Sequence, residues 1–171
     1  MKYSILFFLT ILIFSCTKEI DKPQSRNRIE KPEVGFFAPD FSMLSLDGKK
    51  ISLSDITSDI IVLNFWFTGC PPCIEELPHL KALQENNNPE KLRVILLAAD
   101  SQKNVERFIN NLYRAPLVAL DIDDAAKKYH VEKFPETFIL NKKRIIIDKY
   151  EGYQAWSSPQ LNKYFQSLFA Q

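Results

Sequence analysis

The sequence predicts an α/β protein whose mixed central sheet carries helices on both faces. Two continuous apolar runs, residues 59–67 and 91–100, are typical of strands that are buried on both faces. Stretches with helical spacing of apolar residues alternate with such strands, which favours parallel pairing through crossover helices. Two later strand-like stretches, 136–140 and 144–152, are joined by the polar turn NKKR and predict a closing hairpin. Parallel and antiparallel strands are therefore expected in the same sheet.

The domain is predicted to begin with a β-hairpin. Residues 41–53, FSMLSLDGKKISL, alternate apolar and polar side chains on either side of DGKK, whose composition favours a tight turn. The apolar strand 59–67 follows. A helix is then predicted from Cys70 to about Glu85, because large apolar residues recur there every three positions.

The second half of the domain contains shorter elements. Ser101 is expected to cap a helix that ends near Tyr113, since an N-cap oxygen can accept a backbone hydrogen bond. A short strand at 115–121 and a short helix at 123–130 lead to the closing hairpin. The last helix is predicted to start at Ser157 or Ser158, with Pro159 in its first turn, where the missing N–H of proline costs no hydrogen bond.

Composition indicates one globular domain without nucleic-acid binding. The chain has 171 residues, of which 46% are hydrophobic and 25% charged. A folded chain of this size buries roughly two thirds of the surface that its unfolded form exposes, so it needs no metal or disulfide to support a core. The net charge is +1 and no basic run stands out, which argues against a nucleic-acid partner.

The first fifteen residues, MKYSILFFLTILIFS, are typical of a secretory signal peptide. Lys2 precedes a predominantly apolar run at 5–14, which is too short to span a bilayer as a helix. The stretch LIFSC that ends this run resembles the lipobox of bacterial lipoproteins. The resemblance implies cleavage before Cys16 and a lipid on its sulfur. The alternative is a soluble secreted protein with a spare thiol.

A lipid on Cys16 would account for the odd number of cysteines, because it leaves the other two as a pair. Loss of Lys2 with the signal would balance the basic and acidic residues, so lipid rather than charge would hold the protein at a membrane. Residues 16–33 are polar and are interpreted as the lipidated N-terminus and a flexible tether. Residues 34–171 then form the folded domain.

The stretch FTGCPPCIEELP places two thiols at the start of a predicted helix. Cys70 follows a buried strand and a short loop, at the edge of the sheet where reactive groups gather. Unpaired N–H groups and the positive end of the helix dipole favour its thiolate, so its pKa is expected below the ordinary value of about 8.5. Cys70 is therefore predicted to be the nucleophile and the more exposed thiol. Cys73, three residues on, can close a disulfide with it.

A metal site and a purely structural disulfide are the alternatives for this pair. Zinc needs about four ligands, and the remaining candidates are Cys16, His79 and His130, none of which is placed to complete a site. A disulfide that closes so short a loop adds little stability. A reversible dithiol is the preferred interpretation, with no metal and no other cofactor expected.

The stretch VLNFWFTGCPPCIEELP, followed later by FPETFIL, resembles the thioredoxin superfamily. More closely, it is similar to the membrane-tethered, extracytoplasmic thiol-disulfide oxidoreductases of TlpA/ResA/DsbE type, which are related to AhpC/TSA proteins. The stretch FFAPDFSMLSLDGKKISLSDI resembles their N-terminal hairpin extension. The resemblance covers about residues 35–169 and implies a thioredoxin-like fold.

The resemblance also assigns roles near the sulfurs. Cys70 matches the attacking cysteine and Cys73 the resolving one. Pro135 falls where the family has a cis proline that faces the CxxC motif, with the Phe134 backbone placed to pair with an incoming peptide. The alternative for Pro135 is an ordinary trans proline at the start of a strand.

Two further residues carry weaker assignments. Glu76 matches an acidic residue of this branch and is predicted to hold or relay a proton as Cys73 titrates; the alternative is a solvated helix glutamate. Trp66 matches the aromatic residue before the loop and is a candidate for substrate contact, with simple core packing as the alternative.

Three positions depart from common family patterns. Asn64 stands where thioredoxin itself has a buried aspartate, which favours the TlpA/ResA branch. Gly69 replaces a tryptophan before the first cysteine and is expected to widen access to the substrate. Glu136 replaces a threonine after the cis proline; a carboxylate near the sulfurs would disfavour thiolate and select basic partners.

The leading hypothesis is a membrane-tethered thiol-disulfide oxidoreductase in a bacterial cell envelope, facing the periplasm or the outside. The resemblance favours a reductase of envelope protein disulfides, for example in cytochrome c maturation, which acts as a monomer and draws electrons from a membrane thiol-disulfide relay. A disulfide-forming oxidase is the alternative within this class. A peroxidase is disfavoured because Thr68 is one position away from the peroxiredoxin pattern. A copper-binding carrier that uses Cys70 and Cys73 as soft ligands is the non-enzymatic alternative.

Overall fold

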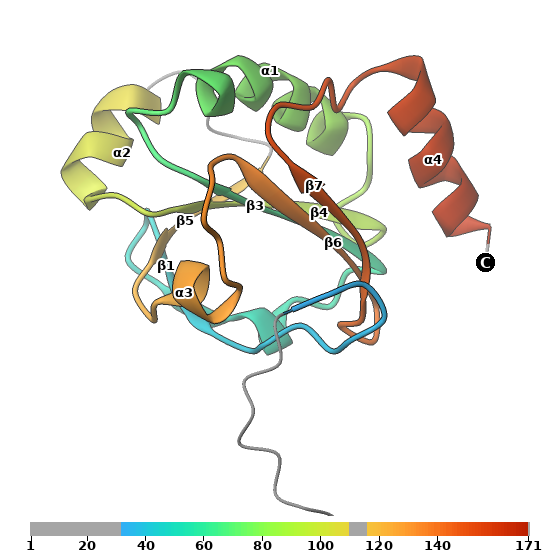
Figure 1. The fold of residues 1–171 in the computed structure, drawn as a ribbon, viewed down its shortest axis with the longest axis horizontal. Coiled ribbons are helices and arrows are strands. Elements are labelled where there is room, and N and C mark those ends of the chain that lie inside the picture. Colours follow the sequence, from blue (N-terminus) through green and yellow to red (C-terminus); the bar gives the residue numbers. More distant parts are fainter. Residues whose placement is uncertain (1–31, 110–115, 171) are drawn as a thin grey trace, which may run out of the picture.

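A seven-stranded mixed sheet forms the centre of the protein (Figure 1). The computed structural model describes residues 32–109 and 116–170, and all seven strands lie in these ranges. The predicted signal peptide, Cys16 and nearly all of the tether lie outside the described residues, as does the predicted helix end near Tyr113. In chain order the elements are β1 (Ser42–Ser45), β2 (Lys50–Ser52), a 3₁₀ turn (Leu53–Asp55), β3 (Ile60–Trp66), α1 (Pro71–Glu85), β4 (Leu92–Ala98), α2 (Gln102–Ile109), β5 (Leu117–Asp121), α3 (Ala125–Lys128), β6 (Glu136–Asn141), β7 (Ile146–Glu151) and α4 (Pro159–Phe169).

The strand order confirms the predicted mixture of parallel and antiparallel pairs. The order across the sheet is β2-β1-β5-β4-β3-β6-β7. Strands β3, β4 and β5 are parallel neighbours, because helical crossovers connect them. The two hairpins, β1–β2 and β6–β7, add antiparallel strands at the edges. The predicted N-terminal hairpin and the closing hairpin are therefore both present.

Strand β3 lies inside the sheet, between β4 and β6, and is buried along its whole length. Successive side chains of a strand point to opposite faces, so β3 contributes to two separate cores. Ile60, Val62 and Trp66 face the core that α1, α2 and α4 cover. Ile61, Leu63 and Phe65 face a second core beneath α3 and the 3₁₀ turn. The prediction of helices on both faces is confirmed, although among the described residues the second face has only α3 and the 3₁₀ turn, both short (Figure 1).

The N-terminal caps of two helices lie where the sequence predicts them. The Ser101 hydroxyl accepts a hydrogen bond from the Asn104 backbone N–H at 3.4 Å, at the start of α2. Ser158, rather than Ser157, is the N-cap of α4, and its side chain accepts from the Leu161 N–H, also at 3.4 Å. These oxygens satisfy N–H groups that have no partner within the helix.

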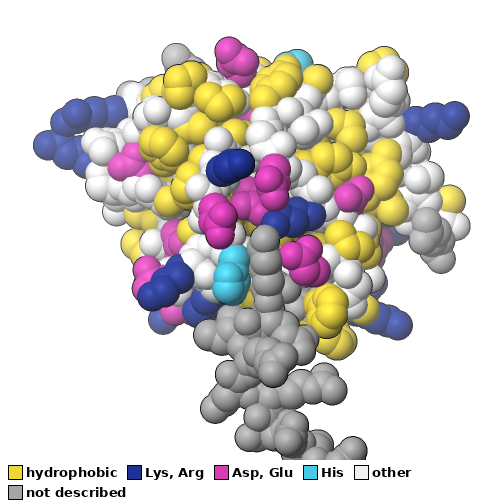
Figure 2. Space-filling view, viewed as in Figure 1, with side chains coloured by type: hydrophobic (Ala, Val, Ile, Leu, Met, Phe, Trp, Pro, Cys, Tyr) yellow, Lys and Arg dark blue, Asp and Glu magenta, His cyan; other side chains and the backbone are white. Residues whose placement is uncertain are grey.

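A buried ion pair joins the two strands of the closing hairpin. The ammonium of Lys149 on β7 lies 2.6 Å from a carboxylate oxygen of Glu136 on β6, and the two side chains are only 12% and 3% exposed. The same ammonium lies 5.2 Å from the centre of the Phe138 ring. Acidic and basic side chains gather on the face of the molecule that Figure 2 shows. The hairpin is thus held by charge as well as by its hydrogen-bond ladder.

Replacing Lys149 with methionine is expected to destabilise the fold by about 3 kcal/mol, because a buried carboxylate then loses the cation that faces it. The matched control is Lys142→Met, whose partner is Asp59 and whose side chain is 74% exposed. Loss of that exposed pair is expected to cost less than about 1 kcal/mol. Urea unfolding measures both, and equal losses would contradict the prediction.

Candidate redox site

Cys70 and Cys73 form a disulfide across the first turn of α1. Cys70 is the N-cap of the helix, and its sulfur accepts a hydrogen bond from the Cys73 backbone N–H at 3.3 Å. Both residues are buried: Cys70 is 3% exposed and Cys73 is 0% exposed. Cys70 is thus the more accessible of the two residues, as the sequence predicts, but it is nearly covered in the oxidised protein.

The prolines between the cysteines fit the start of the helix. Pro71 and Pro72 occupy the first two helical positions, where N–H groups have no partner within the helix. Pro78 lies within the same helix. It has no N–H to donate to the carbonyl four residues before it.

The loop before Cys70 is fixed by an aspartate that the sequence analysis did not single out. Asp100, just beyond β4, accepts hydrogen bonds from the Thr68 backbone N–H at 3.3 Å and from the Thr68 hydroxyl. Burial opposes ionisation of Asp100, but hydrogen bonds from Thr68, Asn104 and Ser101 outweigh it and hold its pKa below the usual value. Thr68 therefore serves to anchor the loop.

Pro135 follows a cis peptide bond, as the family resemblance implies. The carbonyl of Pro135 accepts a hydrogen bond from the Gly152 N–H at 2.8 Å, which connects this turn to the end of β7. The Phe134 ring packs edge-on against the Phe67 ring, with centroids 5.3 Å apart. The loop before the CxxC motif and the cis-proline loop therefore meet through two half-buried aromatic rings.

Gly69 does not leave the position before Cys70 without an aromatic neighbour. A Cβ atom added at Gly69 would lie 3.0 Å from the Phe67 ring, so that ring already occupies the adjacent space. Gly69 itself is exposed. The Phe67 ring therefore limits, on one side, the wider access expected at Gly69. The sequence did not indicate this role, because no spacing or motif marks Phe67.

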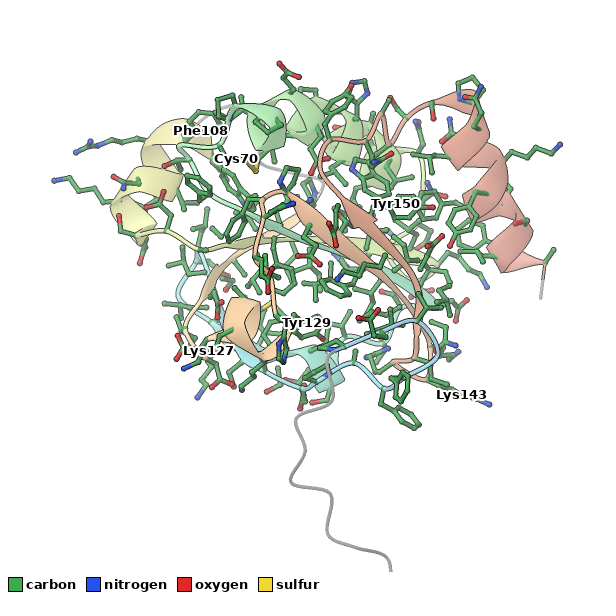
Figure 3. The ribbon with its side chains drawn as sticks, viewed as in Figure 1. Cys70, Phe108, Lys127, Tyr129, Lys143 and Tyr150 are labelled. Atoms are coloured by element: carbon green, nitrogen blue, oxygen red, sulfur yellow. A yellow bond between two sulfur atoms is a disulfide. The ribbon has the colours of Figure 1, made fainter. Side chains whose placement is uncertain are left out.

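Trp66 lies beneath this surface rather than on it. Its side chain is 0% exposed and packs against Phe108 of α2, with ring centroids 6.1 Å apart. The prediction of direct substrate contact by Trp66 is thus wrong for this state, because the ring is covered. Phe108 is 37% exposed and lies at the same end of the molecule as Cys70 (Figure 3).

Glu76 is fully buried, one helical turn below Cys73, so the alternative of a solvated helix glutamate is wrong. One carboxyl oxygen accepts a hydrogen bond from the Asn64 amide of β3 at 2.6 Å. The other accepts from the Gln154 backbone N–H and the Trp156 indole N–H, each at 3.1 Å. Three elements of the fold therefore meet at this carboxyl group.

Burial raises the pKa of Glu76 from 4.5 to about 7, even though hydrogen bonds from Gln154, Trp156 and Asn64 favour its ionised form. The group therefore changes protonation near neutral pH. Asn64 also donates to the Thr137 hydroxyl at 2.9 Å, which connects the same network to β6. Asn64 thus serves as a hydrogen-bond donor at the position where thioredoxin itself has an acid.

Glu136 does not face the sulfurs, so the prediction that its carboxylate acts on them is wrong. It shares a face of the sheet with Phe138, while Thr137 points to the opposite face and the Glu76 network. Its carboxylate is occupied by Lys149. The neighbouring backbone, rather than the side chain, lies at the cis-proline loop.

His79 makes contacts that hold the segment after β7 against α1. His79 of α1 contacts the Ser157 hydroxyl through one ring nitrogen at 2.7 Å, and the Tyr153 hydroxyl lies 3.3 Å from the other. Within residues 32–109 and 116–170, no cluster of three or more His, Cys, Asp or Glu side chains is arranged to hold a metal ion. None of the helices described there is long and apolar enough to cross a bilayer.

A CxxC disulfide at a helix N-terminus, a cis proline in a loop that contacts the loop before the disulfide, and a buried acid below it are the features of a thioredoxin-like thiol-disulfide oxidoreductase. The AhpC/TSA family model matches residues 34–149, and the chain belongs to this family.

The names of relatives with similar sequences fit this class. The thiol-disulfide oxidoreductase ResA of Bacillus thuringiensis is 33% identical over 141 residues, which span 81% of this chain and 80% of the relative. The thioredoxin-like protein YneN of Bacillus subtilis is 35% identical over 130 residues, spanning 71% and 76% of the two chains. A crystal structure of a thiol:disulfide interchange protein DsbE from Chlorobium tepidum has a TM-score of 0.72 at 22% identity and covers 80% of this chain and 98% of its own. That likeness confirms the thioredoxin-like fold.

The stability of the oxidised protein is expected to fall as pH rises from about 4.5 to about 7. In this window the unfolded chain releases the Glu76 proton, whereas the folded protein keeps it because its pKa is raised. Below about pH 4.5 the protonated Glu76 contributes fully to the free energy of unfolding. About 3 kcal/mol of this contribution is lost once the pH exceeds the pKa of Glu76 in the folded protein.

Urea unfolding across this pH range measures the slope. Glu76→Gln is expected to flatten it, whereas Glu75→Gln, at the exposed neighbouring position, is the matched control and is expected to keep it. An unchanged slope in Glu76→Gln would show that another group is responsible.

Proposed function

We propose that this protein is a membrane-tethered reductase of protein disulfides in a bacterial cell envelope. The observation that carries the proposal is the arrangement of Cys73 and Glu76, which are both 0% exposed and lie one turn apart on α1. A resolving thiol in such a place needs a nearby group to take its proton, and the raised pKa of Glu76, about 7, lets its carboxylate accept a proton near neutral pH.

The surroundings of the disulfide favour the reducing direction. Thiolates are disfavoured in apolar surroundings, and Cys70 and Cys73 belong to a core with Trp66 and Leu77. A carboxylate near Cys73 disfavours its thiolate further. Conditions that destabilise the dithiol form make a protein a stronger reductant. The relatives named ResA support the same direction by analogy.

The proposed reaction begins with the reduced protein. The Cys70 thiolate attacks one sulfur of a target disulfide, and the other target sulfur leaves with the bonding electron pair and takes up a proton. The Cys73 thiol passes its proton to the Glu76 carboxylate and attacks the Cys70 sulfur. The target leaves as a dithiol, and the Cys70–Cys73 disulfide holds the oxidation that the target has lost.

A target peptide would be bound at the surface that Phe67, Gly69, Phe134 and Pro135 form around Cys70. The half-buried Phe67 and Phe134 rings provide apolar contact, and the backbone at Phe134 is the element that an extended target strand would pair with. Apocytochrome c cysteines are candidate targets. A dithiol relay in the membrane would then return the protein to its reduced form.

The same proposal includes the cellular location of the protein and its oligomeric state. The signal at 1–15 would direct the chain across the inner membrane, and the lipid on Cys16 would hold it there through the tether at 16–33. The domain would act as a monomer on protein substrates. A disulfide-forming oxidase remains the competing function, because the Cys73 N–H donates to the Cys70 sulfur and favours its thiolate.

A Cys73→Ser variant expressed in its native envelope is expected to accumulate mixed disulfides through Cys70, because the resolving thiol is missing. Non-reducing electrophoresis followed by mass spectrometry identifies the trapped proteins. The control is Cys70→Ser, which is expected to trap none. If the Cys73→Ser variant forms no adducts, the redox assignment is wrong.

The reduction potential separates the two directions. Equilibration of the purified protein with glutathione or dithiothreitol buffers is expected to give a value nearer to about −270 mV than to about −120 mV. A value near or above about −120 mV would contradict the reductase and support the oxidase.

A further inference from the structure

Exposed apolar side chains are concentrated where the chain enters the domain. Val34, Phe36 and Phe37 are 52%, 50% and 73% exposed. Among the described residues only three other large apolar side chains are comparably exposed, and they are scattered. Single exposed apolar residues are ordinary, but three in four consecutive positions indicate an interaction surface.

These residues are held by the sheet. The Gly35 N–H donates to the Ile146 carbonyl at 2.8 Å, and the Ile146 N–H donates to the Phe36 carbonyl at 2.9 Å. Phe37 forms a β-bridge with Ile145. The aromatic side chains therefore project from backbone that is fixed against the start of β7.

A groove of about 610 Å³ lies beside this segment and shares Ile145 with it. Its rim carries Lys91, Lys142 and Lys143, together with Asp59. Asp59 pairs with Lys91 at 2.9 Å and with Lys142 at 3.1 Å, and Glu90 is the other acid near Lys91. The rim therefore has more positive than negative charge. Its apolar lining consists of Ile60, Ile145, Ile147, Leu168 and Phe169.

We propose that this end of the domain docks on the surface of an anionic phospholipid bilayer. The docking face is defined as Val34, Phe36, Phe37 and the three groove lysines. Aromatic side chains favour the boundary between headgroups and acyl chains. The rim has one more cation than anion, and this excess charge near an anionic surface contributes about 1 kcal/mol. The inference rests on the proposed function, in which the lipid on Cys16 anchors the chain to a bilayer. The domain is then always close to the surface of that bilayer.

The tether also explains why so small a face is sufficient. Residues 17–31 can span at most about 50 Å when fully extended. A site connected to its target by such a linker meets an effective concentration of about a millimolar. The docked state of the tethered domain is then populated, even though the same contacts would be too weak to hold a free protein at the bilayer.

Docking through this face would turn the disulfide away from the bilayer. Asn141, next to the groove lysines, pairs with Ile60 at the start of β3, while Cys70 follows the other end of that strand. Seven residues of strand separate the two ends by about 20 Å. Figure 3 shows Lys143 and Cys70 on opposite sides of the molecule. A docked domain would therefore present the sulfurs to proteins in the periplasm at a fixed distance from the bilayer.

The test places tryptophan probes in the full-length, processed protein on vesicles that contain anionic lipids with brominated acyl chains. The wild-type signal from Trp66 and Trp156, both fully buried, is subtracted. The Phe37→Trp variant is expected to lose about half of its added emission, since an interfacial side chain reaches the acyl boundary.

The matched control is Ile122→Trp. Ile122 is 48% exposed and follows β5, whose Leu120 pairs with Ala98 near the disulfide end of the sheet. This probe is expected to keep its emission. Lys142→Gln combined with Lys143→Gln is expected to reduce the quenching of Phe37→Trp on anionic vesicles and leave it unchanged on zwitterionic ones.

Failure of docking and failure of the anchor give different results. The mass of the mature chain shows whether Cys16 carries lipid. A lipidated, vesicle-bound protein in which Phe37→Trp and Ile122→Trp are equally unquenched overturns the docking face and leaves the anchor standing. A chain that has no lipid and does not sediment with the vesicles overturns both. Blue-shifted but unquenched emission from Phe37→Trp would show that a second protein copy covers the face, and would also overturn the proposal.

Discussion

The carboxyl group of Glu76 is the point on which the redox helix is fixed to the rest of the protein. It accepts hydrogen bonds from the Asn64 amide of β3 and from the Gln154 and Trp156 N–H groups in the segment between β7 and α4. An unpaired group at this depth would cost several kcal/mol, so these partners must stay in place for the helix to stay in place. The same burial raises the pKa of Glu76 to about 7, so the interaction that positions the helix also makes the group a usable proton acceptor.

Two loops near the disulfide are held in place by contacts with other parts of the fold. Asp100 holds the loop before Cys70 through Thr68, and the Phe67 ring meets Phe134 at the cis-proline loop. These residues come from three separate parts of the chain, 67–70, 100 and 134, which meet because β3, β4 and β6 are neighbours in the sheet. Because the disulfide is nearly covered, we expect a partner protein to reach it at Cys70, the less buried of the two cysteines. We therefore expect the shape and polarity of the surface around Cys70 to select its partners.

Much of the fold could be predicted because its signals are local. The buried strands were marked by continuous apolar runs, and the helices by spacing and caps, so the mixed sheet and both hairpins were anticipated. The cysteine pair and Pro135 were found because the motif and the family resemblance mark them directly. Trp66 and Glu136 were misassigned because sequence position gives nearness along the chain but not which face of a strand a side chain occupies. Trp66 is covered by α2, and Glu136 turns towards Lys149.

The sequence by itself determined the chemistry: two thiols at a helix N-terminus, separated by two residues, and a resemblance that names their class. Only the tertiary structure decided how the site is tuned. Whether Glu76 is solvated or buried depends on β3 and the segment between β7 and α4 packing against α1, and no local pattern records that. The same holds for Phe67, which lies beside Gly69, and for the exposed phenylalanines, which share one end of the domain with the groove lysines. Burial and electrostatic environment depend on contacts between residues far apart in the chain, and folding alone brings those residues together.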